Sequence, residues 1–232
     1  MVFRSGLPKD LESVCQEKRK EWQKEMEKNA TRIDEYFRFH HSVACDVVSR
    51  RQDAGREETP LSRLKDLIRI YGVGLVLNTT LYGRASCLMT AVKNGWGQSD
   101  QLVGEDLVKY QILECSDVNY KAGGIGEDMT ALHWAGWCFN KPIESCVKIA
   151  RWLVEAGGVI DALDKYGKTP LRIAIEHQHA DIVKEMMKLC ASLHKAQAAS
   201  KDIDKYNSAM KTDQIKEAIV LGESFLQNCI PG

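Results

Sequence analysis

Cysteine and histidine are the side chains of this 232-residue sequence that could hold a metal ion. His41 and Cys45 are four positions apart, as are Cys190 and His194, so each pair on a helix would present two ligands to one side. A structural zinc site needs four such ligands, and nothing in the spacing brings the two pairs together. We therefore expect no metal and no cofactor, and interpret these residues as thiols and histidines of ordinary helices.

Nucleophilic catalysis would need a cysteine or serine beside a base. His133 with Cys138 or Cys87 is a combination that an enzyme could use, but no spacing marks it out. The sequence contains neither G-x-S-x-G nor H-E-x-x-H. The glycine-rich stretches 72–74 and 123–126 lack the Lys-Ser/Thr of a nucleotide-binding loop, so we interpret them as turns. We expect a protein without enzymatic activity.

The overall composition narrows the class of protein. Lys and Arg number 32 and Asp and Glu number 32, which gives zero net charge, with 44% hydrophobic residues. This balance argues against a strongly basic nucleic-acid binder and against an acidic disordered chain. The apolar stretches are far shorter than a membrane span, and the start of the chain does not resemble a secretory signal. The eight scattered cysteines form no C-x-x-C, so we expect reduced thiols in a cytoplasmic or nuclear location.

Helices are expected through most of the chain. Residues 9–52 are rich in helix formers, and neither Pro nor Gly occurs between Pro8 and Gly55. The apolar stripe is thin before Ile33 and thicker after it, which predicts a surface helix followed by a segment, 33–52, that enters the core. Residues 200–228 predict one or two further helices. We interpret 33–52 and this C-terminal segment as the caps of the regular part between them.

The regular part contains three similar segments. They read Ser-Cys-Leu-Met-Thr-Ala at 86–91, Thr-Ala-Leu-His-Trp-Ala at 130–135 and Thr-Pro-Leu-Arg-Ile-Ala at 169–174, and a second apolar pattern follows each. The segments resemble the ankyrin repeat, a unit of two antiparallel helices with a period of 33 residues and the signature T-P-L-H-x-A. The resemblance extends over about 60–195, where 64–74 reads as half a copy.

The physical chemistry of the last copy agrees with this resemblance. Thr169 is suited to cap a helix whose first turn begins at Pro170. Leu171 and Ala174 lie on one face of that helix, and the apolar positions between 182 and 187 form the answering face of the next. Gly72 and Gly157 are suited to the left-handed conformation that ends a helix. One such pair cannot bury its own apolar face, so the copies must stack.

The repeats also depart from the family pattern. Thr130 and Thr169 are 39 positions apart, six more than the period, and the extra residues fall around 140–145. A similar insertion occupies 95–104. We predict an all-α, ankyrin-like helical solenoid of about three repeats with helical N- and C-terminal caps. Its parts are an N-terminal helical segment at 1–59, the repeats at 60–195 and a C-terminal cap at 196–232.

The resemblance implies a monomeric module that binds a protein partner, as an adaptor, an inhibitor or a host-directed effector, and binds no nucleic acid. The alternative is an enzyme or effector whose activity resides in the N-terminal helices or the insertions, with the repeats serving for targeting. In the family, partners contact the turn before the first helix and the concave face. Trp134 and Trp137 are either exposed there or covered by the insertion and part of the core. The candidate partner-binding residues are Tyr82, Arg84, Met129, Trp134, Trp137, Lys165, Tyr166, Lys168, Ile173 and His177.

Overall fold

The computed structural model describes residues 7–8, 10–28, 60–78, 85–93, 101–123, 127–138, 141–198 and 203–229. These residues form helices joined by turns and loops, with an isolated antiparallel bridge between Ala122 and Met129. The helices are α1 (Leu11–Lys28), α4 (Pro60–Tyr71), α5 (Val73–Asn78), α6 (Cys87–Lys93), α7 (Gln101–Leu113), α8 (Ala131–Trp137), α9 (Ile143–Glu155), α10 (Pro170–Glu176), α11 (Ala180–Lys188), α12 (Leu193–Ala198), α13 (Ile203–Met210) and α14 (Asp213–Cys229).

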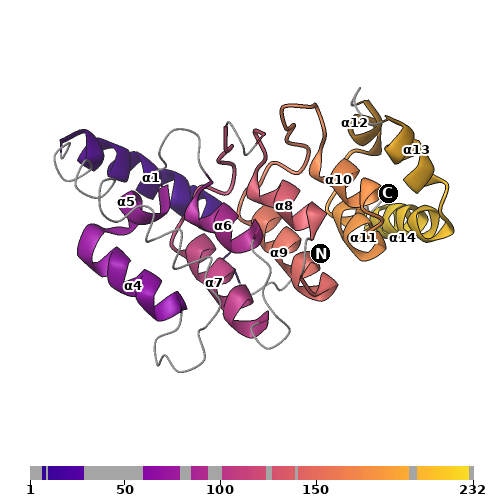
Figure 1. Ribbon diagram of the computed structural model, residues 1–232. Coiled ribbons are helices and arrows are strands. Elements are labelled where there is room, and N and C mark those ends of the chain that lie inside the picture. Colours follow the sequence, from indigo (N-terminus) through magenta and orange to yellow (C-terminus); the bar gives the residue numbers. More distant parts are fainter. Residues whose placement is uncertain are drawn as a thin grey trace.

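The helices stack in two layers, as Figure 1 shows. We call α6, α8 and α10 the first-helix layer, and α7, α9 and α11 the second-helix layer. Each helix contacts its pair mate and the equivalent helices of the neighbouring pairs. The loops that lead into α8 and α10 project from one edge of the stack (Figure 1). The prediction of an all-α helical solenoid is confirmed.

The helix boundaries follow from local chemistry. The Thr169 hydroxyl accepts a hydrogen bond from the Arg172 backbone N–H at 3.2 Å, and Pro170 occupies the first turn of α10. Gly72 follows α4 with φ +85° and Gly157 follows α9 with φ +89°, a conformation that costs glycine little. These caps and stops are those that the sequence predicts.

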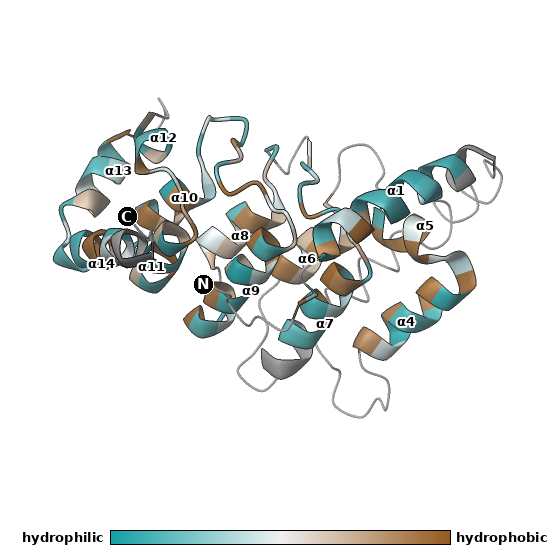
Figure 2. Ribbon diagram, turned by 180° about the vertical axis from the view of Figure 1, so that it is seen from behind, coloured by the Kyte–Doolittle hydropathy of each residue, from teal (hydrophilic) through white to brown (hydrophobic). Residues whose placement is uncertain are grey.

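The core lies between the two layers. Leu171 and Ala174 of α10 are fully buried, and they meet the answering face of α11. Figure 2 shows hydrophobic and hydrophilic residues on different sides of the helices, as burial of one face requires. The predicted apolar positions of α11 are all buried, namely Ile182, Val183, Met186 and Met187.

Both ends of the stack are covered by irregular helices. At the C-terminal end, α12 and α13 pack against α10, and α14 packs against α11, with Ala209, Ile215 and Ala218 buried, so the further helices predicted over 200–228 are present. At the N-terminal end α1 packs against α5, and a Cβ atom on Gly74 would lie 2.7 Å from Trp22 Cβ. The predicted cap at 33–52 lies outside the described residues.

The expectation of reduced thiols is wrong for four of the cysteines. Cys15 of α1 is joined to Cys115, 100 positions along the chain, with the two Cα atoms 4.8 Å apart. Cys138 is joined to Cys146 across the turn between α8 and α9, with a Cα–Cα distance of 5.9 Å. The predicted cytoplasmic or nuclear location is based on reduced thiols, so the cysteines no longer support it. The location stays a prediction.

Two further expectations concern membranes and metals. Within the described ranges, no helix combines the length and the apolar character that a membrane crossing requires. In the same ranges, His, Cys, Asp and Glu do not gather in groups of three that could hold a metal ion. Cys190 and His194 do not share a helix, because Cys190 lies in the turn after α11 with φ +69° and His194 belongs to α12. The pair His41 and Cys45 lies outside the described residues.

Candidate functional site

The predicted partner-binding residues divide into buried and accessible ones. Met129 is 4% exposed and Ile173 is 6% exposed, and both pack in the core, so we remove them from the candidate surface. Tyr82 and Arg84 lie outside the described residues. Trp134 and Lys168 are each only 9% exposed. The accessible members are the half-exposed Trp137, Tyr166 and His177 and the exposed Lys165.

A row of aromatic rings crosses from α8 to the end of α10. The Trp134 and Trp137 rings stack at 5.2 Å with an interplanar angle of 9°. The Trp137 ring lies 5.4 Å from the His177 ring, which lies 6.0 Å from the His179 ring. We call these four residues the aromatic row. The alternatives for the two tryptophans therefore separate, because Trp134 is buried whereas Trp137 is half-exposed.

Lysines from neighbouring units surround the row at its α6 side. Lys93, the last residue of α6, places its Nζ 4.5 Å from the centre of the Trp134 ring. Lys141, in the insertion before α9, donates from Nζ to the Val92 carbonyl at the end of α6. Burial lowers the pKa of the Lys141 ammonium to about 7. The insertion thus ties the middle repeat to the preceding first helix.

At the other side of the row, His177 faces a mostly basic set of groups. Burial first, and then the Lys205 ammonium and His179, lower the pKa of His177 to about 4. Lys168 acts in the same direction, and Glu176 opposes it. His179 Nε2 lies 2.8 Å from the Trp137 carbonyl oxygen, which fixes the end of the row to α8. At neutral pH the His177 ring is uncharged and presents an aromatic face.

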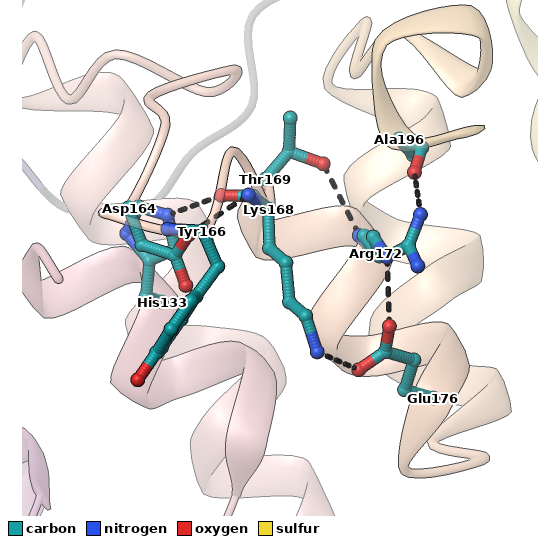
Figure 3. Close-up of polar contacts among 8 residues, drawn as sticks. All are labelled: His133, Asp164, Tyr166, Lys168, Thr169, Arg172, Glu176 and Ala196. Atoms are coloured by element: carbon teal, nitrogen blue, oxygen red, sulfur yellow. Dashed lines mark hydrogen bonds and ion pairs between the residues drawn. The ribbon is translucent and has the colours of Figure 1, made fainter. Parts of the chain in front are cut away.

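Glu176 is the centre of a buried polar network, drawn in Figure 3. Its carboxylate accepts from Lys168 Nζ at 2.8 Å and from Arg172 Nε at 2.7 Å. Arg172 is fully buried, and its Nη1 also donates to the Ala196 carbonyl at 3.2 Å. Two cations therefore contact the same carboxylate. The sequence interpretation placed Lys168 on the partner-binding surface, which is wrong because its side chain is buried in this ion pair with Glu176.

His133 has a structural role rather than a catalytic one. The backbone N–H of Thr130 donates to His133 Nδ1 at 3.0 Å, so Nδ1 is the acceptor nitrogen and Nε2 carries the hydrogen. Nε2 then donates to the Lys168 carbonyl at 3.1 Å. Cys138 is bonded to Cys146, and the buried Cys87 thiol donates to the Val76 carbonyl at 3.4 Å. The candidate nucleophile–base combination is therefore not assembled.

The loop tips of the middle and last repeats are joined to each other. Lys165 Nζ lies 3.0 Å from Glu127 Oε1, and the Tyr166 hydroxyl donates to the same oxygen at 2.6 Å. The Lys165 backbone N–H also donates to the Glu127 carbonyl at 2.9 Å. Asp164 accepts from the backbone N–H groups of Tyr166 and Lys168 at 2.8 Å each, which holds the turn (Figure 3). These hydrogen bonds hold Tyr166 in a fixed position at the tip of its loop.

A groove of about 550 Å³ lies beyond the aromatic row, among α9, α11 and α14. Its lining includes Ile143, His179, Asp181, Lys184, Glu217 and Leu221. His179 therefore belongs both to the groove and to the aromatic row. The charged side chains of the groove have both signs, so its charge selects no partner.

Comparison with known protein families identifies the repeats. The family model for ankyrin repeats, in three copies, matches residues 88–197. This region of the chain belongs to the ankyrin-repeat family. The match runs from the start of α6 to α12, so α4 and α5 precede it and α13 and α14 follow it. No curated protein matches the chain in sequence. Ankyrin repeats are in general protein–protein interaction modules, so the prediction that the chain contains such a module is confirmed. Its role as an adaptor, an inhibitor or an effector stays a prediction.

Proposed function

We propose that this ankyrin-repeat protein is an adaptor that holds a protein partner against the aromatic row and the neighbouring loop edge, and that it performs no reaction of its own. The observation that carries the proposal is the position of Trp137. Its ring is half-exposed, and it is held between the Trp134 ring at 5.2 Å and the His177 ring at 5.4 Å.

Rigid aromatic side chains are what a binding hot spot needs. A tryptophan offers a large apolar area, and one that is already fixed loses little conformational entropy when a partner binds. Trp137 is fixed from both sides, and Tyr166 is fixed through its hydroxyl bond to Glu127. Hot spots are enriched in these residue types. The two accessible aromatic residues therefore support recognition of a protein surface.

The proposal favours an adaptor over the alternative of an enzyme or effector with activity outside the repeats. Of the residues that the alternative requires, α1 and the second insertion from Lys141 are described, whereas 29–59 and most of the first insertion lie outside the described residues. Within the described part, the buried His133, Arg172 and Glu176 have partners that stabilise the fold. A monomeric state and a cytoplasmic location stay predictions.

The decisive experiment compares Trp137→Ala with Trp152→Ala. Trp152 is a matched control, because it is also half-buried and also lies near a lysine, with Lys109 Nζ 5.7 Å from its ring centre, but it belongs to α9 in the second-helix layer. Affinity capture with quantitative mass spectrometry should show that Trp137→Ala loses about 30-fold of the partner bound by wild type, the effect of about 2 kcal/mol at a hot spot. Trp152→Ala should retain the partner.

Equal loss of partner in the two variants, with equal loss of thermal stability, would contradict the proposal, since the tryptophans would then act through the fold. Retention of the partner by Trp137→Ala would contradict it as well. Thermal unfolding followed by circular dichroism supplies the stability comparison.

A further inference from the structure

The charged groups around the aromatic row are mostly positive. At one end the exposed Lys93 lies over the Trp134 ring. At the other end the charged groups that act on His177 are Lys205, Lys168 and Glu176. Glu176 is the one carboxylate in that set, and it is buried in ion pairs with Lys168 and Arg172. A partner that lies along the row therefore meets an exposed ammonium group at each end, Lys93 at one and Lys205 at the other.

The middle of the row is apolar and flat. Trp137 is half-exposed, and His177 beside it is uncharged at neutral pH because its pKa is lowered to about 4, chiefly by burial. The groups thus follow the order cation, aromatic surface and cation, from Lys93 on α6 across α8 and the end of α10 to Lys205 on α13, and Figure 1 shows these helices in that order.

We propose that the partner segment bound on this face is an acidic peptide, a short stretch of Asp and Glu residues that also carries an apolar side chain. The carboxylates pair with Lys93 and Lys205, and the apolar side chain packs on Trp137. This inference rests on the proposed function and specifies the chemistry of the partner for the same surface.

The dimensions of the row set the length of the peptide. Packed helices lie about 8–10 Å apart, so α6 and α13, which are separated by α8 and α10, are roughly 30 Å apart. An extended chain covers about 3.3 Å per residue, so about nine residues cover this distance. Carboxylates at the two ends of such a segment, with the apolar side chain between them, match the order of groups along the row.

The alternative anionic ligand is a single-stranded nucleic acid, which combines stacking on aromatic rings with backbone charge. The structure favours the peptide for two reasons. The chain as a whole has zero net charge, so the long-range attraction that drives nucleic-acid binding is absent. The row also belongs to ankyrin repeats, which are protein-binding modules in general. The nucleic acid is therefore an outcome of the test and not the proposal.

The probe is a fluorescein-labelled peptide of 12 residues that contains six Glu, two Phe and four Gly. A second peptide replaces each Glu by Gln, a third replaces each Glu by Lys, and a labelled 12-nucleotide deoxythymidine strand serves as the nucleic acid. Fluorescence anisotropy at about 50 mM salt should show that the Glu peptide binds at least tenfold tighter than the Gln peptide. Its affinity should fall as salt rises to about 300 mM, because exposed charges are screened.

Two variants place the binding site on the protein. The double variant Lys93→Glu/Lys205→Glu should weaken the Glu peptide at least tenfold, because both ammonium groups are lost and two repelling carboxylates appear. Lys109→Glu is the matched control, since Lys109 lies near the Trp152 ring on the other layer, and it should bind as wild type does. Lys93 and Lys205 are exposed, so these changes should leave the unfolding temperature nearly unchanged.

Three results would overturn the inference: equal binding of the Glu and Gln peptides, equal weakening by Lys109→Glu and by the double variant, or tighter binding of the thymidine strand than of the Glu peptide. The proposed function fails separately. If Trp137→Ala loses its captured partner while the Lys93→Glu/Lys205→Glu variant retains it, a protein partner is bound on the row and its acidic character is refuted. If Trp137→Ala retains the partner, the proposed function itself is refuted.

Discussion

The first helices of the middle and last repeats, α8 and α10, have different residue types at the same buried position. His133 and Arg172 are each the third residue of their helix, and each is fully buried. His133 donates to the Lys168 carbonyl, and Arg172 donates to the Ala196 carbonyl. In both repeats this position therefore connects one unit to the backbone of the next unit along the stack.

The difference lies in the charge that each solution buries. The His133 ring is neutral: Nδ1 accepts from the Thr130 backbone N–H and lies 2.9 Å from the Thr130 hydroxyl, and Nε2 donates to the Lys168 carbonyl. Arg172 brings a full positive charge into the interior, which is costly unless it is paired. Glu176 supplies the counter-charge and Tyr206 of α13 lies 4.8 Å from the guanidinium. The middle repeat packs against the last repeat, which His133 reaches at the Lys168 carbonyl. The last repeat packs against the C-terminal cap, which the longer Arg172 side chain reaches at Ala196 and Tyr206.

The largest expected effect comes from removing the counter-charge. Glu176→Gln removes the buried carboxylate charge that pairs with both Arg172 and Lys168, so we expect a loss of about 3 kcal/mol in the free energy of unfolding, measured by urea denaturation. His133→Leu in the middle repeat leaves neutral partners unsatisfied, and should cost less, about 2 kcal/mol.

Asp213→Asn is the control for loss of an ion pair, because the Asp213 side chain is fully exposed beside Lys216 and should give no measurable change. A smaller loss of stability for Glu176→Gln than for His133→Leu would contradict the comparison. The buried charge of Arg172 would then depend less on its partner than the neutral His133 ring does.

A second test uses pH to change the charge of His133. Burial lowers the pKa of His133 to about 4, against an ordinary value of 6.5 in the unfolded chain. The unfolded chain therefore takes up the proton first, so stability is complete above pH 6.5 and declines as pH falls toward 4. Lowering pH from 7 to 5 should cost about 2 kcal/mol through this residue. Urea denaturation of wild type and His133→Gln at both pH values measures it.

His177→Gln is the companion variant, because the pKa of His177 is also lowered to about 4. Since the pH dependence follows the size of the pKa shift, we expect this variant to remove a similar part of it. If His133→Gln kept the full pH dependence of wild type, the buried neutral ring would not be the group responsible.

The stacked helix pairs could be predicted from the sequence because their signals are local. Thr169 and Pro170 set the start of α10 within one turn, and Gly72 and Gly157 end helices by their own conformation. Apolar spacing in α11 specifies which face is buried. Each of these signals is complete within about ten residues, so no knowledge of the rest of the chain is required.

The parts that could not be predicted depend on distant segments. The spacing of Trp134 and Trp137 places both on one side of α8, but Trp134 is buried beneath Lys93 from another helix whereas Trp137 is half-exposed. Glu176 is of a residue type that is rarely buried, yet it lies in an ion-pair network beneath the C-terminal cap. Cys15 and Cys115 are 100 residues apart, so no local spacing reveals their disulfide.

The smallest expected effect comes from the helix caps. Thr169→Ala removes the hydroxyl that accepts the Arg172 backbone N–H, and should lower the free energy of unfolding by about 1 kcal/mol, whereas Thr169→Ser should retain it. Thr130→Ala should cost less, because His133 Nδ1 still accepts the backbone N–H of residue 130. Urea denaturation of the three variants measures the difference. Equal losses for Thr130→Ala and Thr169→Ala would show that the His133 ring adds nothing to the start of α8, and the two repeats would then begin alike.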